Sequence, residues 1–320
     1  MLPKSRLVSV FVLGLGIAMI TAAVLGGAFV HRDARLPAAQ EIATLAIVDP
    51  AAEVASAAGE ELVTKPVTMQ RHLTIADPFA ADQAGVRIGY AWVADDGDPA
   101  GLIDASIWGY RINRITGLQI SPTVVSSLPG MPPAKVELHG LTIKFPADIE
   151  QTTVQYVDPT LRATFPMNRT DAFTRDGRDI DVWTQTIPDS IVGEFYASPT
   201  NTGQVTTAAG VTRPVLKHYA AKRELHVDHR TGIIIAQREQ VQLSYVTVDG
   251  EERFPTLRFD GINSDQSQQE LLDFAATLPT GAGLLAIRIL LAAGGALAVI
   301  LGLIGVFGLF GRKQATRNLH

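Results

Sequence analysis

Two long apolar runs, one near each end of the chain, constrain its fold more than any other feature. Residues 7–30 and 284–310 are mostly apolar, and each run is longer than the roughly 20 residues that an α-helix needs to cross a hydrocarbon core about 30 Å thick. The apolar core of a cleavable signal peptide is shorter, about 7–15 residues. We therefore expect both runs to be retained as transmembrane helices.

The charges predict the orientation of these helices. All 32 acidic residues lie between Asp33 and Asp273. The basic residues of the membrane runs and of the two chain ends are Lys4, Arg6, Arg288, Arg312, Lys313 and Arg317. Basic flanks stay on the cytoplasmic side of a membrane. Arg32 and Arg35 follow the first apolar run, on its predicted outer side, and therefore argue against this orientation. The basic residues after the second run, Arg312, Lys313 and Arg317, decide in its favour. We predict a two-pass plasma-membrane protein in which residues 1–6 and 311–320 are cytoplasmic and residues 31–283 form an extracytoplasmic domain.

Composition narrows the chemistry of this outer domain. The 47% hydrophobic content of the chain is raised by the two helices, and the segment between them has an ordinary globular composition. The chain has no cysteine, which excludes disulfides, a thiol nucleophile and Cys-ligated metal sites. The acidic character of the outer segment argues against a nucleic-acid partner.

The outer segment is rich in strand-forming patterns. Val, Ile, Thr, Tyr and Trp gather in short runs that Gly, Pro, Asn and Asp interrupt: 67–75, 86–93, 106–113, 135–145, 152–157, 182–187, 215–227, 232–248 and 256–259. The fold class we expect is a membrane protein with two transmembrane helices flanking a mainly antiparallel β (α+β) extracytoplasmic domain. Residues 49–63 and 264–278 are expected to be helical, and the proline-rich residues 128–134 are a candidate joint.

A short internal repeat predicts two similar hairpins. Residues 111–120 and 226–235 share an Asn or Asp, a basic residue, a Thr-Gly pair and then apolar residues. An Asx side chain accepts hydrogen bonds from a turn, and glycine adopts the positive φ that closes it. The predicted turn residues are Asn113, Thr116 and Gly117 in the first copy and Asp228, Thr231 and Gly232 in the second.

Small residues recur at a spacing of four in both membrane runs. They are Gly14, Ala18, Ala22 and Gly26 in the first, and Gly294, Ala298 and Gly302 in the second. Small residues on one helix face permit close helix packing in lipid. We expect these faces to pair the two helices, with self-association as the alternative.

No catalytic signature is found in the sequence. The nucleophile-elbow, P-loop, HExxH and dinucleotide-binding motifs are all missing. The closest approach to a metal site is His218, His226, Asp228 and His229, but Arg223 and Arg230 add positive charge to the same stretch. We therefore assign no catalytic residue, cofactor or metal ligand and expect a non-enzymatic protein.

Several stretches resemble a known family. The segments 140–146 (GLTIKFP), 153–158 (TVQYVD) and 177–183, together with the 228–232 hairpin and both apolar runs, resemble the actinobacterial PorA-like family of two-pass envelope proteins. The family name implies a channel of the outer envelope. An outer-membrane barrel also needs aromatic girdles, and this chain has only three Trp and six Tyr. The order helix, β-rich domain, helix is similar to class B scavenger receptors, whose outer domain encloses a lipid tunnel.

These observations lead to a functional hypothesis with two alternatives. We expect the outer domain to bind or relay a lipid or other apolar envelope component, so that membrane lipids are its partners. The first alternative is a structural or accessory subunit that binds another envelope membrane protein. The second is a porin-like channel component.

Overall fold

The computed structural model describes residues 4–29, 34–37, 40–56, 61–75, 82–94, 101–206 and 210–307. The chain forms two compact units. One contains Met1–Ala34 with Pro279–His320, and the other contains Arg35–Leu278. We describe each unit by itself.

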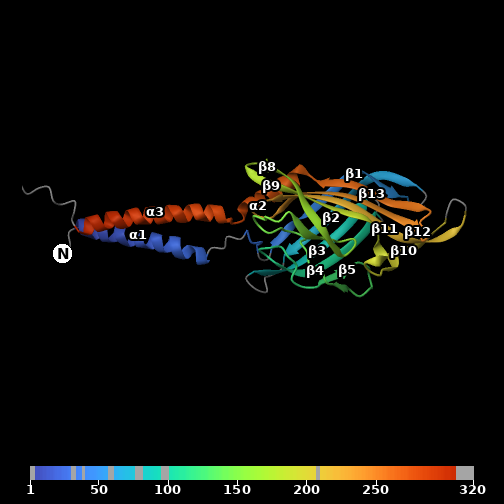
Figure 1. Cartoon of the computed structure of the whole chain (residues 1–320), viewed down its shortest axis with the longest axis horizontal. Coiled ribbons are helices and arrows are strands. Elements are labelled where there is room, and N and C mark those ends of the chain that lie inside the picture. The colour runs from blue at the N-terminus through green and yellow to red at the C-terminus, as the bar shows by residue number, and fades with distance from the viewer. Residues whose placement is uncertain are drawn as a thin grey trace, which may run out of the picture. The chain divides into compact units, whose positions relative to one another are not determined.

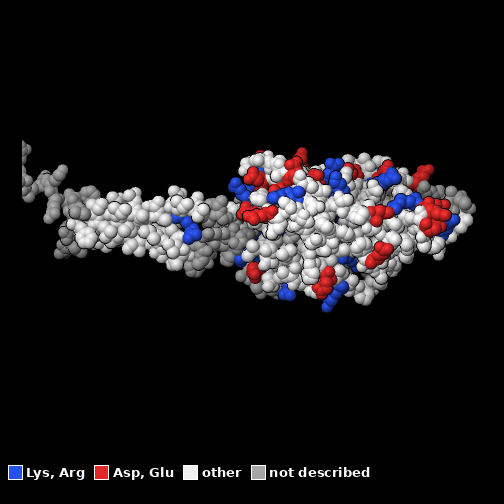
Figure 2. Space-filling model, in the orientation of Figure 1, with Lys and Arg blue, Asp and Glu red and all other residues white. Residues whose placement is uncertain are grey.

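The first unit is a pair of long apolar helices, α1 (Lys4–Phe29) and α3 (Gly281–Val306). Within them, residues Leu7–Leu25 and Leu285–Val306 are long and apolar enough to cross a membrane. The helices pack along their length, and Arg288 of α3 donates from Nε to the Ala23 carbonyl oxygen of α1 at 2.7 Å. In the space-filling view, the described surface of this unit is almost free of charge, whereas the other unit carries many charged side chains (Figure 2).

The second unit is built on one curved antiparallel sheet with 13 described strands (Figure 1). Its strands are β1 (Gln40–Ala55), β2 (Leu62–Ile75), β3 (Gln83–Ala94), β4 (Leu102–Asn113), β5 (Thr123–Ser126), β6 (Ala134–Val136), β7 (Thr153–Asp158), β8 (Ala163–Arg175), β9 (Arg178–Ile191), β10 (Thr202–Thr206), β11 (Thr212–Asp228), β12 (Ile234–Thr247) and β13 (Arg253–Asn263). The order across the sheet is β6-β5-β4-β3-β2-β1-β13-β12-β11-β9-β8-β7, with β10 beside β11. The expected fold class, two terminal apolar helices around a large antiparallel domain, is confirmed.

A segment that is not a regular strand links the two ends of this sheet. The Leu141 amide donates to the Gln155 carbonyl in β7 at 2.9 Å, and Gly140 accepts from the Gln119 amide at 3.3 Å. Gln119 in turn bridges to Ile112 of β4. Residues 140 and 141 therefore connect β7 to the β4 side of the sheet and cover backbone groups that an open edge would expose.

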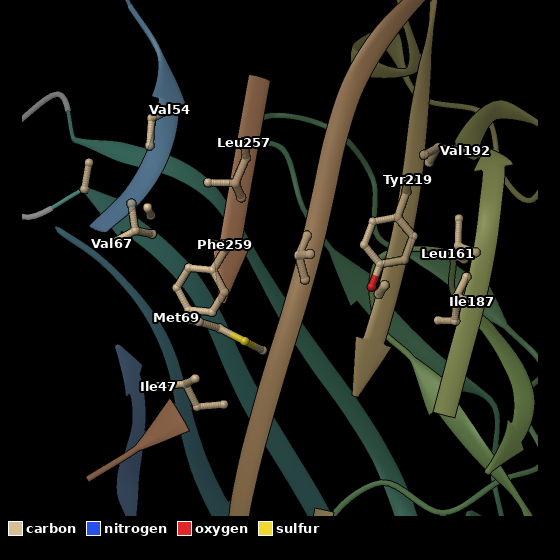
Figure 3. Close-up of a cluster of buried hydrophobic side chains, with 14 of the residues drawn as sticks. Ile47, Val54, Val67, Met69, Leu161, Ile187, Val192, Tyr219, Leu257 and Phe259 are labelled. Atoms are coloured by element: carbon tan, nitrogen blue, oxygen red, sulfur yellow. The ribbon is translucent and has the colours of Figure 1, made fainter. Parts of the chain in front are cut away.

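The concave side of the sheet is filled by side chains. One buried cluster contains Leu45, Ile47, Ala52, Val54, Val67, Met69, Ala94, Leu161, Ile187, Val192, Tyr219, Ala221, Val241, Leu257 and Phe259 (Figure 3). A second cluster contains Leu141, Phe145, Ile149, Tyr156, Met167, Trp183, Leu225, Val227 and Ile234. In β2, for example, Val67, Met69, Leu73 and Ile75 are buried while the residues between the two members of each pair are more exposed, which is the period-2 pattern of a strand with one buried face. Burial of this apolar surface is the main source of the domain's stability.

The structure confirms one of the two expected outer helices and corrects the other. Helix α2 (Asp265–Thr277) begins after Ser264, whose hydroxyl accepts from the Ser267 amide at 3.2 Å. Residues 49–63 were expected to be helical, but residues 49–55 belong to β1 and residues 62–63 to β2. Pairing of β1 with both β2 and β13 outweighs the helix propensity of Ala and Glu. Residues 128–133 lie between β5 and β6 within the single β-rich unit.

Candidate functional site

An apolar pocket lies between the sheet and α2. Its lining residues are Leu36, Leu45, Arg71, Leu73, Ile143, Ile233, Ile234, Leu271 and Phe274. All except Arg71 are hydrocarbon side chains. The free volume is about 40 Å³, which is close to the space taken by one water molecule. A larger ligand would have to displace part of the lining.

The pocket lies at the end of the β-rich unit where the chain enters and leaves it. Leu36 is the second residue of this unit, and α2 ends at Thr277, one residue before its last. Only three residues separate the end of α2 from the start of α3 at Gly281. The linker from α2 to the apolar, membrane-length helix α3 is therefore short.

Helix α2 forms the outer wall of the pocket. Its buried residues are Gln268, Leu272 and Ala275, while Leu271 and Phe274 are half-buried and line the pocket. Gln268 is its main polar attachment, because Nε2 donates to the Asn263 carbonyl at 2.9 Å and Oε1 accepts from Arg175 at 2.8 Å. The helix is thus held by an apolar stripe and one glutamine.

Arg71 is the charged group of the pocket. It lies opposite Tyr90 on the neighbouring strand β3, with its side chain on the same face as the buried Met69 and Leu73. Burial raises the pKa of Tyr156, and Arg71, which hydrogen-bonds to that tyrosine, opposes part of the rise. Within the described parts of the chain, no carboxylate forms an ion pair with Arg71.

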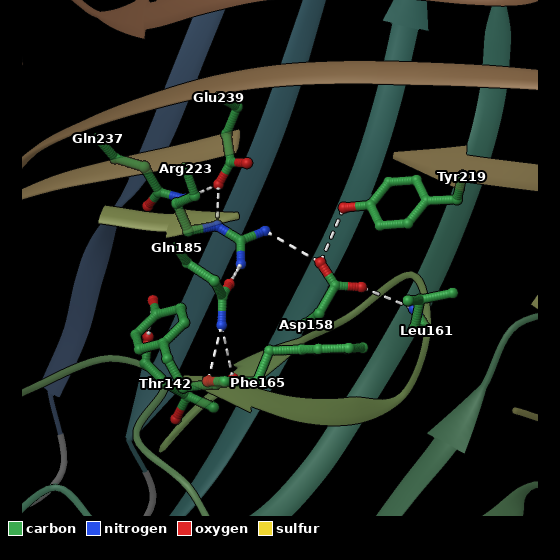
Figure 4. Close-up of polar contacts among 10 residues, drawn as sticks. Thr142, Asp158, Leu161, Phe165, Gln185, Tyr219, Arg223, Gln237 and Glu239 are labelled. Atoms are coloured by element: carbon green, nitrogen blue, oxygen red, sulfur yellow. Dashed lines mark hydrogen bonds and ion pairs between the residues drawn. The ribbon is translucent and has the colours of Figure 1, made fainter. Parts of the chain in front are cut away.

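A second inward-facing arginine, Arg223, is fully neutralised (Figure 4). It donates to Glu239 through Nε, to Gln185 at 2.6 Å and to Asp158 at 3.3 Å. Asp158 also accepts from the Tyr219 hydroxyl at 2.8 Å. Burial opposes the charge on Arg223, but Glu239 and Asp158 outweigh it and hold the pKa of Arg223 well above its usual value. This network joins strands β7, β9, β11 and β12 and has its charges and donors satisfied internally.

The repeated sequence forms the two hairpin turns that its pattern predicts. Asn113 Oδ1 accepts from the amides of Ile115 and Thr116 at 2.9 and 3.0 Å. Asp228 Oδ2 accepts from the Thr231 amide at 3.0 Å and from its hydroxyl at 2.5 Å.

The glycines of both turns pack against one segment. Gly117 and Gly232 have φ of +76° and +73°. A methyl group on Gly117 would lie 2.1 Å from the Lys144 carbonyl oxygen, and one on Gly232 would lie 1.9 Å from that of Phe145. Both turns therefore pack closely against the backbone of residues 144 and 145.

Lys144 is buried between these turns. Its Nζ donates to the carbonyl oxygens of Ile115 and Phe145, each at 2.8 Å, and its side chain is fully inaccessible to solvent. Burial lowers the pKa of Lys144 to about 7. Lys144 thus ties the first hairpin to the segment that links the ends of the sheet.

The histidines considered as metal ligands each bond to a different carboxylate. His218 pairs with Asp189 at 3.1 Å, and His226 pairs with Glu224 at 3.1 Å. His229 pairs with Asp181 at 2.8 Å. The carboxylate of Asp228 is held by Arg178 at 2.7 Å. Over the residues that the structure describes, no group of three potential metal ligands converges.

A larger open groove of about 510 Å³ crosses the outer faces of β11, β12 and β13. Its carboxylates are bonded within the protein. Glu53 pairs with Arg258 at 2.9 Å, Asp260 pairs with Arg238 at 2.8 Å, and Asp49 accepts the Asp260 amide at 2.7 Å. The pocket beneath α2 differs because its charge, Arg71, forms no ion pair with any described carboxylate.

The second membrane helix presents its predicted small residues to the first. A methyl group on Gly302 would lie 2.7 Å from the Leu13 amide nitrogen, and one on Gly294 would lie 3.0 Å from Met19 Cε. Ala298 is half-buried in the helix pair.

The contact face of the first helix differs from the predicted one. Gly14, Ala18 and Ala22 are exposed, and Gly14 has open space around it. Gly16 makes the contact instead, because a methyl group there would lie 2.7 Å from the Gly295 carbonyl oxygen. At 100° per residue, positions 14 and 16 lie on nearly opposite sides of a helix. The side chain at position 26 lies outside the described residues.

Sequence reasoning missed Arg71 and the pocket. The inward-facing positions of β2 run Val67, Met69, Arg71, Leu73 and Ile75, so the arginine interrupts an apolar period-2 pattern. An isolated charged residue on the apolar face of a predicted strand is the sequence signal that could have identified Arg71. The rest of the lining comes from segments that are distant in sequence and meet only in the fold.

Together, these features define a membrane protein with two candidate spanning helices and a large antiparallel β domain between them. The family model described as Porin PorA matches residues 8–304, so the chain belongs to this family of porin-like envelope proteins. The match confirms the resemblance seen in the sequence. A search of curated proteins found no match.

Proposed function

We propose that this chain is a non-enzymatic plasma-membrane protein whose extracytoplasmic domain binds a lipid or another apolar envelope component beneath α2. The observation that carries this proposal is the pocket lined by eight hydrocarbon side chains beside Arg71. An apolar concave site with one convergent polar group is the usual form of a small-molecule site. The short linker between α2 and the candidate membrane helix α3 supports a ligand that comes from the membrane.

The interior of the domain argues for a pocket over a continuous tunnel. Two apolar clusters and the Arg223 network occupy the concave side of the sheet. A lipid chain would therefore enter at the α2 end and displace Leu271 and Phe274, which are half-buried. Each of these side chains loses apolar contact that the ligand chain replaces.

Photo-crosslinking tests this proposal with the full-length chain. The chain is reconstituted in nanodiscs of phosphatidylcholine that carries a diazirine in one acyl chain, and labelled residues are mapped by mass spectrometry. We expect labels on α1 and α3 and also within residues 264–278. Phe274→Trp, which enlarges a pocket wall, should reduce labelling of residues 264–278 severalfold. Phe195→Trp, at an exposed position away from α2, is the matched control. Labels restricted to α1 and α3 would overturn the proposal.

A porin-like channel is the second candidate, and the family description supports it. A channel built from this chain requires several copies or a rearranged domain, because side chains fill the described interior. Planar-bilayer recordings with the purified chain test it. Stepwise conductance would support a channel, and the absence of conductance steps at saturating protein concentration would contradict this candidate.

An accessory role in an envelope complex is the third candidate. The exposed small residues Gly14, Ala18 and Ala22 leave one face of α1 open to another helix. Crosslinking in cells followed by purification tests this role. A stoichiometric membrane partner that is lost with Ala18→Leu supports it, and recovery of the chain alone contradicts it.

A further inference from the structure

Arg71 occupies an unusual electrostatic position. A guanidinium stays charged at any physiological pH and is rarely left inside a protein without a counter-charge. Arg71 is half-buried, lines an apolar pocket and contacts the neutral Tyr156. Nothing in the described part of the chain neutralises it at ion-pair distance.

The buried acids Glu239 and Asp158 are already engaged elsewhere. Glu239 accepts from Arg223 and from Gln237 Nε2 at 2.5 Å, and Asp158 accepts from Arg223 and Tyr219. Both carboxylates are needed there, because they alone neutralise the fully buried Arg223. Moving either one to Arg71 would leave a buried charge unpaired, which is costly.

Tyr156 orients Arg71 without neutralising it. The Tyr156 hydroxyl donates to the Thr142 carbonyl at 2.6 Å, and Thr142 Oγ1 accepts from the Tyr110 hydroxyl at 2.8 Å. This buried chain of hydrogen bonds fixes the phenol that contacts Arg71. A guanidinium carries five N–H donors in a planar fork, and this fork can form two parallel, charge-assisted bonds to a planar or tetrahedral oxyanion.

We propose that the pocket takes an anionic amphiphile, with a carboxylate or phosphate paired to Arg71 and the hydrocarbon chain against Leu73 and Phe274. This inference rests on the proposed lipid-binding function and adds the charge of the ligand. The head group of the ligand neutralises Arg71, and its hydrocarbon chain packs against the apolar walls of the pocket. Because the free volume is only about 40 Å³, α2 moves outward when the ligand enters.

The test compares three photoactivatable probes that share one C18 chain: oleic acid, oleyl lysophosphatidic acid and oleyl alcohol. Each is added to the full-length chain in neutral phosphatidylcholine nanodiscs, and labelling within residues 264–278 is quantified after tryptic digestion. The peptide that holds α2 runs from Phe259 to Arg288, since trypsin cleaves after Arg258 and Arg288. We expect at least one acidic probe to label about tenfold more than the alcohol, as a charge-assisted hydrogen bond predicts.

Variants of Arg71 then test whether this residue causes the preference for acidic probes. Arg71→Gln should reduce labelling by the acids to the level of the alcohol, whereas Arg71→Lys should keep part of the preference because its charge remains. Arg87→Gln is the matched control, because Arg87 is exposed on the adjacent strand β3. Retention of the preference in Arg71→Gln would overturn the inference. If Arg71→Gln does not fold, Arg71→Lys decides: a preference lower than that of the wild type supports the pair with Arg71, and an unchanged preference contradicts it.

The remaining outcomes separate the two proposals. Equal labelling by all three probes overturns the anionic head group and leaves the lipid-binding function standing. No labelling of residues 264–278 by any probe overturns both. A response to oleic acid alone identifies a carboxylate, and a response to the lysophosphatidic acid alone identifies a phosphate.

Discussion

Two inward-facing arginines show how burial can be compensated in different ways. Arg223 is 3% exposed and lies between Asp158 and Glu239, so the fold itself neutralises it. Arg71 is half-buried, and its described partner is the neutral Tyr156. The counter-charges of Arg223 come from the domain itself, whereas under our proposal the counter-charge of Arg71 comes from a ligand.

Lys144 makes stability depend on pH in a defined direction. Burial lowers its pKa to about 7 in the folded protein, while the unfolded chain keeps a lysine pKa near 10.4. Between these values the unfolded chain binds more protons, so stability rises with pH at up to about 1.4 kcal/mol per pH unit. We expect the melting temperature of the full chain in detergent, followed by circular dichroism, to rise between pH 7.5 and 9.5.

Lys144→Met should remove that rise. At pH 9.5, where the folded wild type holds Lys144 neutral, the variant should also be the less stable protein, because the carbonyl oxygens of Ile115 and Phe145 lose their donor. Lys222→Met is the control, since Lys222 is exposed and the rise should persist there. The same pH dependence in Lys144→Met and in the wild type would show that another group causes it.

At the scale of elements, the sequence predicts what local patterns determine. Most of the expected strands, the cap at Ser264 and both Asx turns follow from alternation, capping and turn chemistry. The strand expected over residues 135–145 was wrong beyond its start, because β6 ends at Val136. The helix expected at residues 49–63 was wrong because β1 is stabilised by two neighbouring strands, which no local window contains. The pocket was missed for the same reason, since Arg71, Ile143 and Phe274 come from three separate segments.

The packing face of α1 shows another limit of spacing rules. A repeat of small residues every four positions identifies a possible face, but α1 has small residues on more than one side. Gly16 and Gly295 meet, while Gly14 lies in open space. Which face is used depends on the partner helix, and the sequence of one helix alone does not specify it.

Two glycine turns allow the cost of close packing to be separated from the cost of positive φ. Gly177 has φ of +72° and open space around it, so Gly177→Ala should cost about 1–2 kcal/mol for the left-handed backbone alone. Gly232→Ala adds a collision with the Phe145 carbonyl and should cost about 3 kcal/mol or more. Chemical denaturation of both variants in detergent measures the difference. Equal losses of unfolding free energy in the two variants would mean that residues 144 and 145 move aside at little energetic cost.

The helix pair offers a matched test in α1. Gly16→Leu should separate α1 from α3, because even a methyl group at position 16 would lie 2.7 Å from the backbone of α3. Gly14→Leu should leave the pair intact. Because the chain has no cysteine, Met19→Cys with Gly294→Cys creates the sole thiol pair for a short bismaleimide crosslink. The crosslink should be lost with Gly16→Leu and retained with Gly14→Leu, and the opposite result would assign the contact to the other face.

At the scale of the whole molecule, charge and hydropathy act together. The acidic residues all lie between the two membrane-length helices, and basic residues stand at both chain ends. This distribution favours an outer β-rich domain and two cytoplasmic ends. The proposed ligand requires this orientation if it is drawn from the outer leaflet.

Thiol labelling tests this orientation directly. Glu251→Cys lies at an exposed position of the β-rich domain, and Asn318→Cys lies in the C-terminal tail. In spheroplasts, a membrane-impermeant maleimide should label Glu251→Cys at once and Asn318→Cys only after detergent is added, because the basic C-terminal segment stays inside. The cysteine-free parent chain reports background. Labelling of Asn318→Cys before detergent would invert the topology, and the pocket would then face the cytoplasmic leaflet and its lipids.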